Sequence, residues 1–152
     1  MALISDTDPE QLAELLKNAL VKGCSPAGLL SSKEGVELVS LVAPEGHQRH
    51  TGVSRSTRAD YASQSLGAAC ARLSSRCDAL RHLLGLADDA DDKNLTERRE
   101  DVATMGFADS GDSFRRRKEA AWMFEVAVEL QILVEGSYAP WVRAEQLEFG
   151  LP

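Results

Sequence analysis

The sequence predicts an all-α fold, a bundle of four to five helices arranged around a long central helical hairpin. Three observations support this prediction. The chain is 43% hydrophobic and 27% charged, as globular proteins are, and only 5% aromatic, which favours a core made of helices. Several long segments place their apolar residues at helical spacing. With 152 residues, the chain is long enough to bury one core, so we expect a single helical domain over residues 1–152.

The first helix is predicted over residues 9–22. Asp8 is a suitable N-cap, Pro9 suits a first helical turn, and Gly23 follows the predicted end. Its apolar residues form one stripe at spacings of three and four, which must pack against another element. The stripe consists of Leu12, Leu15, Leu16, Ala19 and Leu20.

The longest helix is predicted over residues 57–86, with Thr57 and Asp60 in the pattern of a capping box. Along it, apolar residues alternate spacings of four and three, which is the pattern of a heptad seam that needs a partner helix. We expect Leu73 and Leu80 to be buried in this seam. The seam consists of Leu66, Cys70, Leu73, Cys77, Leu80 and Leu84.

The second arm of the hairpin is predicted over residues 113–135, although this segment allows two interpretations. Apolar and polar residues alternate along much of it as they do in a strand, whereas its length and composition favour a helix. The apolar run 36–42 fits a strand and a short helix equally well. The alternative to the bundle is therefore an α+β domain with short strands near 36–42 and 124–134.

The remaining segments are predicted to be connections and one short helix. Residues 44–56 lack periodicity and are predicted to form a mobile loop. After an acidic linker, a short helix is expected to begin at Asn94 or Thr96 and to end at Gly106. A break at Gly136 and Ser137 then leads to a carboxy-terminal docking helix or tail over about 137–152.

Charge and cysteine content exclude several classes of function. The formal net charge of −7 disfavours nucleic-acid binding. The sequence lacks any run of 18 uncharged apolar residues and any basic segment leading into an apolar stretch at its start, which predicts no membrane association. The odd number of cysteines, Cys24, Cys70 and Cys77, indicates reduced thiols. The expected location is cytoplasmic.

The sequence contains no catalytic motif of the phosphate-loop, nucleophile-elbow or zinc-helix type. We therefore predict no catalytic residue, no metal site and no cofactor. The expected function is that of a non-enzymatic protein-binding module, an adaptor, inhibitor or dedicated chaperone that acts through helical surfaces. Because the apolar helix faces exceed what one short helix can cover, we also expect a twofold homodimer.

The candidate partner-binding residues are four consecutive cations and two tryptophans: Arg115, Arg116, Arg117, Lys118, Trp122 and Trp141. The cations are predicted to occupy the first turn of a helix, where the helix dipole disfavours positive charge. Such an arrangement indicates either a function or compensation by nearby acids. Asp109, Asp112 and the linker aspartates are the acids expected to compensate.

Two further hypotheses belong to other classes. The first is a small enzyme acting on a phosphorylated or acidic substrate through Arg115–Lys118 and the loop that holds His47 and His50. The second is a regulator that contacts nucleic acid through the arginines, which predicts strong dependence on salt.

Overall fold

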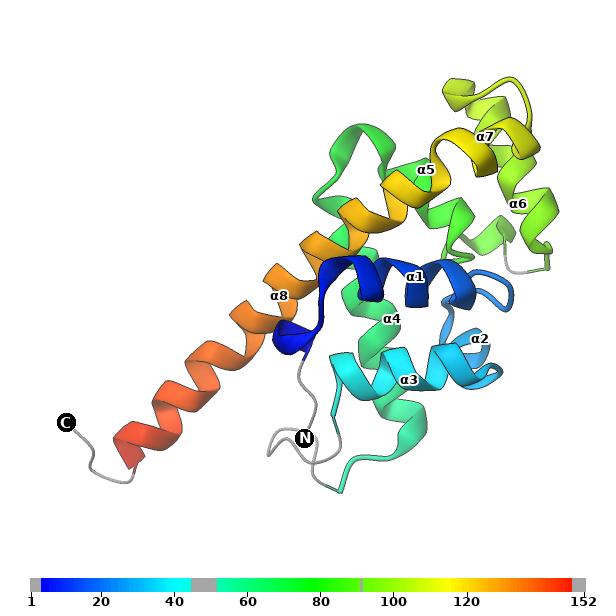
Figure 1. The fold of residues 1–152 in the computed structure, drawn as a ribbon. Helices are drawn as coiled ribbons and strands as arrows, with labels where there is room; N and C mark the ends of the chain where they lie inside the picture. The colour runs from blue at the N-terminus through cyan, green and yellow to red at the C-terminus, as the bar shows by residue number, and fades with distance from the viewer. Residues whose placement is uncertain (1–3, 45–51, 91, 149–152) are drawn as a thin grey trace.

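The computed structural model describes residues 4–44, 52–90 and 92–148, with residues 136–148 described by their backbone alone. The described residues form eight α-helices and no β-strand (Figure 1). The all-α prediction is confirmed, and the α+β alternative is excluded because residues 36–42 and 124–134 are helical. The helices are α1 Pro9–Ala19, α2 Pro26–Leu30, α3 Lys33–Val42, α4 Arg55–Ala71, α5 Cys77–Leu83, α6 Leu95–Val102, α7 Gly111–Arg117 and α8 Glu119–Glu148.

Six of these helices begin at a short polar side chain that accepts a hydrogen bond from the backbone of the first turn. Asp8 and Asn94 are caps that the sequence predicted, and Asn94 forms a reciprocal capping box with Glu97. α4 is capped by Ser54 and not by Thr57, so it begins within the predicted loop. The six caps are Asp8, Ser25, Ser32, Ser54, Asn94 and Ser110.

The single helix predicted over residues 57–86 is wrong, because the chain turns after Arg72 and separates α4 from α5. Leu73 leaves the helical region at φ −103° and ψ 51°, and a 3₁₀ turn follows over Ser74–Arg76. Serine competes for backbone hydrogen bonds and lowers helix propensity here. Arg72 also pairs with Glu129 of α8 at 2.5 Å. Of the two predicted seam leucines, Leu80 is buried and Leu73 is only half-buried.

The helix predicted over residues 113–135 is also two helices, since Lys118 adopts φ −126° and ends α7. Past this break, α8 continues without interruption to Glu148. The predicted break at Gly136 and Ser137 is therefore wrong. A helix that is already formed extends at low cost, and a helix anchored over 119–134 continues through Gly136 and Pro140 despite their low propensity.

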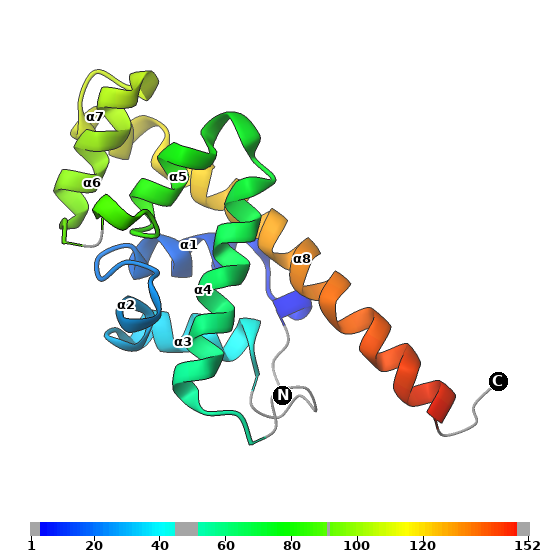
Figure 2. The same ribbon diagram turned by 180° about the vertical axis from the view of Figure 1, so that it is seen from behind.

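The helices share one hydrophobic core that contains buried residues from all eight of them. α8 is the longest and packs against α1 and α4, so the predicted central pairing is formed by α4 and α8 with α1 alongside (Figures 1 and 2). Gln131 of α8 donates to the backbone oxygens of Ile4 and Thr7 at 3.0 and 2.7 Å. The carboxy-terminal part of α8 extends beyond the other helices in both views.

The carboxy-terminal ends of α1 and α5 meet at the buried side chain of Arg98, which is only 2% exposed. Its guanidinium donates to Leu83 O and Leu20 O at 2.5 Å each, and to Val21 O at 3.5 Å. The side chain also donates to Lys93 O at 3.3 Å. One cation thus binds backbone carbonyls at the carboxy-terminal ends of two helices, where the helix dipoles favour positive charge.

Two glycines allow these helix ends to approach each other. Gly23 and Gly85 follow α1 and α5 at φ +82° and +74°, a left-handed conformation that glycine adopts without strain. A Cβ atom at Gly85 would lie 3.6 Å from both Gly23 Cα and Arg98 Nη1. The Cys24 amide completes the junction by donating to Leu84 O at 2.7 Å. The chain segments after α1 and α5 are thus joined through backbone atoms, and α6 is joined to both through the side chain of Arg98.

The first prediction concerns this junction. Replacing Arg98 by Met keeps much of its apolar volume but leaves Leu83 O buried without a donor, while Leu20 O keeps the hydrogen bond from the Gly23 amide. An unsatisfied buried acceptor costs about 1–3 kcal/mol, so the free energy of unfolding is expected to fall by about 1–3 kcal/mol in urea titrations. The Arg98→Lys variant retains the charge but not the planar fork, and an intermediate loss is expected. Equal stability of wild type and Arg98→Met would contradict this role.

Candidate protein-binding surfaces

The predicted basic cluster lies at the carboxy-terminal end of α7, not in a first helical turn. Arg115, Arg116 and Arg117 form the last turn of α7, and Lys118 ends it. All four residues are exposed. The prediction that the dipole opposes these charges is therefore corrected, because cations at a helix carboxy terminus are favourable.

The cluster is partly neutralised by its own helix. Asp112 contacts Arg115 at 2.8 Å and Arg116 at 3.0 Å, whereas Asp109 is not the cap of α7, a position taken by Ser110. Arg117 has no ion-pair partner among the residues that the structure describes. The hydrogen bond from Arg115, and then the charge of Arg116, lower the pKa of Asp112. Internal compensation is thus present and incomplete.

The linker aspartates were also expected to compensate the cluster, but Asp89 contacts a histidine of α5 instead. Asp89 Oδ1 lies 3.4 Å from His82 Nε2 of α5. On α6, Asp101 accepts a hydrogen bond from Lys93 at 2.7 Å and lies 3.9 Å from the same histidine. His82 is a half-buried residue at the edge of α5, as expected.

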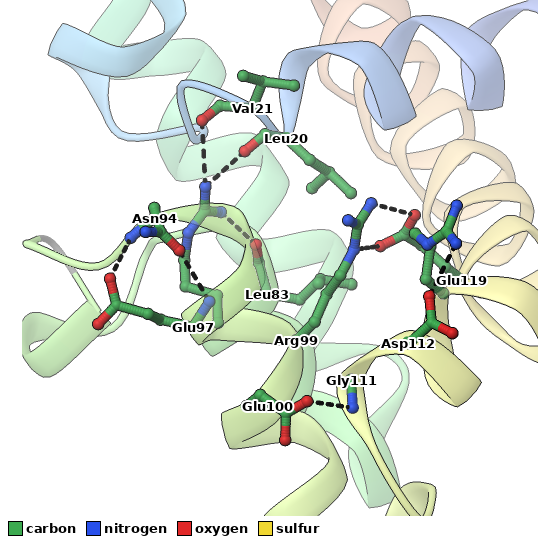
Figure 3. A network of polar contacts seen from close by, with 12 residues as sticks. Leu20, Val21, Leu83, Asn94, Glu97, Arg99, Glu100, Gly111, Asp112 and Glu119 are labelled. Carbon is green, nitrogen blue, oxygen red and sulfur yellow. Dashed lines mark hydrogen bonds and ion pairs between the residues drawn. The ribbon is translucent and has the colours of Figure 1, made fainter.

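The first residues of α7 and α8 are each bound to α6 by a polar contact (Figure 3). Arg99 binds the fully buried carboxylate of Glu119 through two hydrogen bonds of 2.7 and 2.9 Å. The next residue, Glu100, accepts from the Gly111 amide at 2.7 Å and so binds the first turn of α7. Gly111 has no room for a side chain, because a Cβ there would lie 2.7 Å from Glu100 Oε1.

Two tryptophans, Trp122 and Trp141, were predicted to bind a partner. Trp122 is 6% exposed and packs edge-on against Phe107 and Phe114, at 5.1 and 4.8 Å between ring centroids. The guanidinium of Arg76 lies 5.5 Å from its ring centroid. Trp122 therefore contributes to the core and not to an exposed surface. The side chain of Trp141 lies outside the described residues, and so does the segment that contains His47 and His50.

A second surface, which the sequence analysis missed, lies on the solvent side of α8. Ala120, Phe124, Val128 and Ile132 follow each other at intervals of four and form one stripe, which we call the α8 stripe. Phe124 is 41% exposed and Ile132 is 48% exposed, whereas Val128 is half-buried. The opposite face of α8 contributes its large side chains to the core. The apolar and polar alternation over 124–132 arises because α8 carries apolar residues on both faces.

A third surface is a groove of about 580 Å³ between α1 and α3 that is open to solvent. The two helices run side by side in opposite directions (Figure 1). Leu15 and Leu41 supply its apolar lining, and both are half-buried against the core. Its charged residues are Glu14, Glu34, Glu37 and Lys33. Sequence reasoning could not find this groove, because it depends on how two helices are placed relative to each other.

Two of the three cysteines are buried in the core. Burial raises the pKa of both Cys24 and Cys70 to about 12, so these thiols are poor nucleophiles. All three cysteines are free, in agreement with the predicted reduced thiols. Within the described parts of the chain, no three His, Cys, Asp or Glu side chains are grouped as metal ligands.

Comparisons with protein-family models, curated proteins and solved structures give no match to this chain. Among the helices that the structure describes, none has the length and apolar character needed to cross a membrane.

The second prediction tests the anchor of α8. Glu119→Gln removes the carboxylate charge that faces Arg99 and is expected to lower the free energy of unfolding by about 3 kcal/mol, because breaking a buried pair leaves one charge uncompensated. As a control, Asp112→Asn breaks only exposed pairs and should cause a much smaller loss of stability than Glu119→Gln. Urea titration of both variants measures the difference. Similar losses for the two would contradict the assignment of Glu119 as the anchor.

The third prediction uses the lowered pKa of Asp112. A carboxyl group with a lowered pKa keeps its ion pairs above its ordinary pKa and loses them as the pH falls through the lowered value. Replacing Arg115 by Gln should therefore raise the pKa of Asp112 towards its ordinary value in an NMR titration of the carboxyl carbon. Arg117→Gln is the matched control, since Arg117 is not a cause of the shift. An unchanged pKa in the Arg115 variant would disprove the pairing.

Proposed function

We propose that the chain is a non-enzymatic protein-binding module, an adaptor, inhibitor or dedicated chaperone, that acts through its helical surfaces and forms a twofold homodimer. The observation that carries this proposal is the α8 stripe. Large apolar side chains half exposed in a row on one rigid helix are typical of surfaces that bind other proteins. The stripe lies on the face of α8 opposite its core residues, so the fold does not require it.

The side chains of the α8 stripe match in size those of the same stripe on a second copy of the chain. If two α8 helices pair antiparallel about a twofold axis near residue 126, position 124 of one helix faces position 128 of the other. Ile132 then faces Ala120, so the bulkiest end of one stripe meets the smallest end of its partner. Such large-to-small matching lets two helices approach closely.

The charges that flank the stripe support the same arrangement. Arg117, just before α8, is exposed, and so is Glu135, which follows Ile132 by less than one turn. In the antiparallel pair, Glu135 of one copy lies near the start of α8 of the other, which follows the exposed Arg117 at the end of α7, so opposite charges come close together. A parallel pair would bring like charges together, which disfavours it.

The fourth prediction tests this dimer by light scattering at about 1 to 100 micromolar protein. We expect a twofold mass for the wild type and a shift towards the mass of one chain for the Phe124→Ser/Ile132→Ser variant, with dissociation at least about tenfold stronger. Val21→Ser is the control, because Val21 is an exposed apolar residue, 61% exposed, that is not part of the α8 stripe. Its mass should equal that of the wild type.

Two outcomes would overturn the proposed dimer. One is a wild-type mass of a single chain over the whole concentration range. The other is a twofold mass that the double variant leaves unchanged, which would place the interface elsewhere. Thermal unfolding of the double variant provides the check on folding, because exposed positions should change stability by only about 0.5 kcal/mol.

A further inference from the structure

We propose that the groove between α1 and α3 binds a basic amphipathic helix of a partner protein. This inference rests on the proposed function as a protein-binding module and adds a second surface with a partner of defined chemistry. The groove is separate from the α8 stripe, since none of its lining residues belongs to α8.

The charge of the groove indicates a cationic partner. Its lining contains three carboxylates, Glu14, Glu34 and Glu37, and one ammonium group, Lys33, which gives a local net charge of −2. None of the three glutamates forms an ion pair among the residues that the structure describes. The whole chain carries a net charge of −7, so its long-range field attracts the same kind of partner.

The shape of the groove indicates a helix. Its two walls are helices of 11 and 10 residues, which correspond to lengths of about 16 and 15 Å. Three turns of a third helix span that length. The backbone groups of helical walls are already bonded, so an extended peptide would gain no backbone hydrogen bonds from them. A helix satisfies its own backbone and contributes only side chains.

The apolar lining explains why the partner helix must be amphipathic. Leu15 of α1 and Leu41 of α3 lie on opposite walls of the groove, and both are half-buried. An apolar stripe on the partner would cover these two leucines while its lysines or arginines reach the glutamates. A small molecule fits less well, because binding pockets enclose most of their ligand and this groove is open along its length.

The test uses a fluorescent peptide of about 14 residues made of leucine and lysine at amphipathic helical spacing, titrated with the full-length protein at low salt. Binding is expected, and Glu14→Gln/Glu37→Gln should weaken it by about five- to tenfold. The Asp60→Asn/Asp78→Asn variant removes the same two charges from exposed positions outside the groove, and its affinity should stay within about twofold of the wild type.

Two further peptides separate groove binding from general charge attraction. A peptide with serine in place of leucine keeps the positive charge and should bind at least about tenfold more weakly. A peptide with glutamate in place of lysine should not bind. Equal losses for the two double variants, or equal affinity for the serine and leucine peptides, would overturn the groove proposal.

Failure of the groove proposal can be distinguished from failure of the proposed function. Glu14→Gln/Glu37→Gln should leave the mass measured by light scattering unchanged, since these residues lie away from α8. A dimer that does not bind the leucine and lysine peptide would refute the groove alone. Peptide binding that is lost in Phe124→Ser/Ile132→Ser and retained in the groove variant would assign the helix to the α8 stripe and refute the groove.

Discussion

The arrangement of the helices depends on one buried guanidinium, that of Arg98. Carbonyl groups at the end of a helix need donors, and a buried helix end without them is strongly destabilising. In this fold α1 and α5 both end in the interior, and Arg98 of α6 donates to Leu20 O and Leu83 O at 2.5 Å each. Burial lowers the pKa of Arg98, but an arginine remains charged at neutral pH and so complements both helix dipoles. Because α6 is fixed here, its next residues, Arg99 and Glu100, are placed to hold α8 and α7.

Local signals in the sequence predicted part of this fold. Asp8 and Asn94 start helices, and Gly23 and Gly106 end helical segments, because caps and left-handed glycines act on neighbouring backbone groups. The breaks near Leu73 and at Lys118 were not predictable in the same way. They divide segments of good helical periodicity, and α5 and α8 take their directions from contacts distant in sequence, such as Arg72 with Glu129. Periodicity identifies a buried face but does not show whether the helix bearing it is continuous.

The basic cluster shows how one helix boundary changes a functional argument. With a single helix over 113–135, four cations at its start indicate strain or a special role. With the boundary at Lys118, the same residues end α7, where the dipole favours them, and Asp112 neutralises part of their charge. Their exposure alone therefore gives no reason to assign them a partner. The α8 stripe is a better candidate for a binding surface, because Phe124 and Ile132 expose large apolar side chains to water, which is unfavourable.

The stripe can be exposed because other contacts determine the position of α8. Its buried face packs on α1 and α4, Glu119 is bound by Arg99, and Gln131 is bonded to the backbone before α1. These interactions are independent of Phe124, Val128 and Ile132. The residues that stabilise α8 and the stripe that we propose for binding therefore lie on opposite faces of one helix, and the stripe can change without loss of the fold. The same division holds for α1, whose Leu12 and Leu16 are buried while Glu14 and Leu15 line the groove. Each surface is thus rigid before any partner arrives, which lowers the entropic cost of binding.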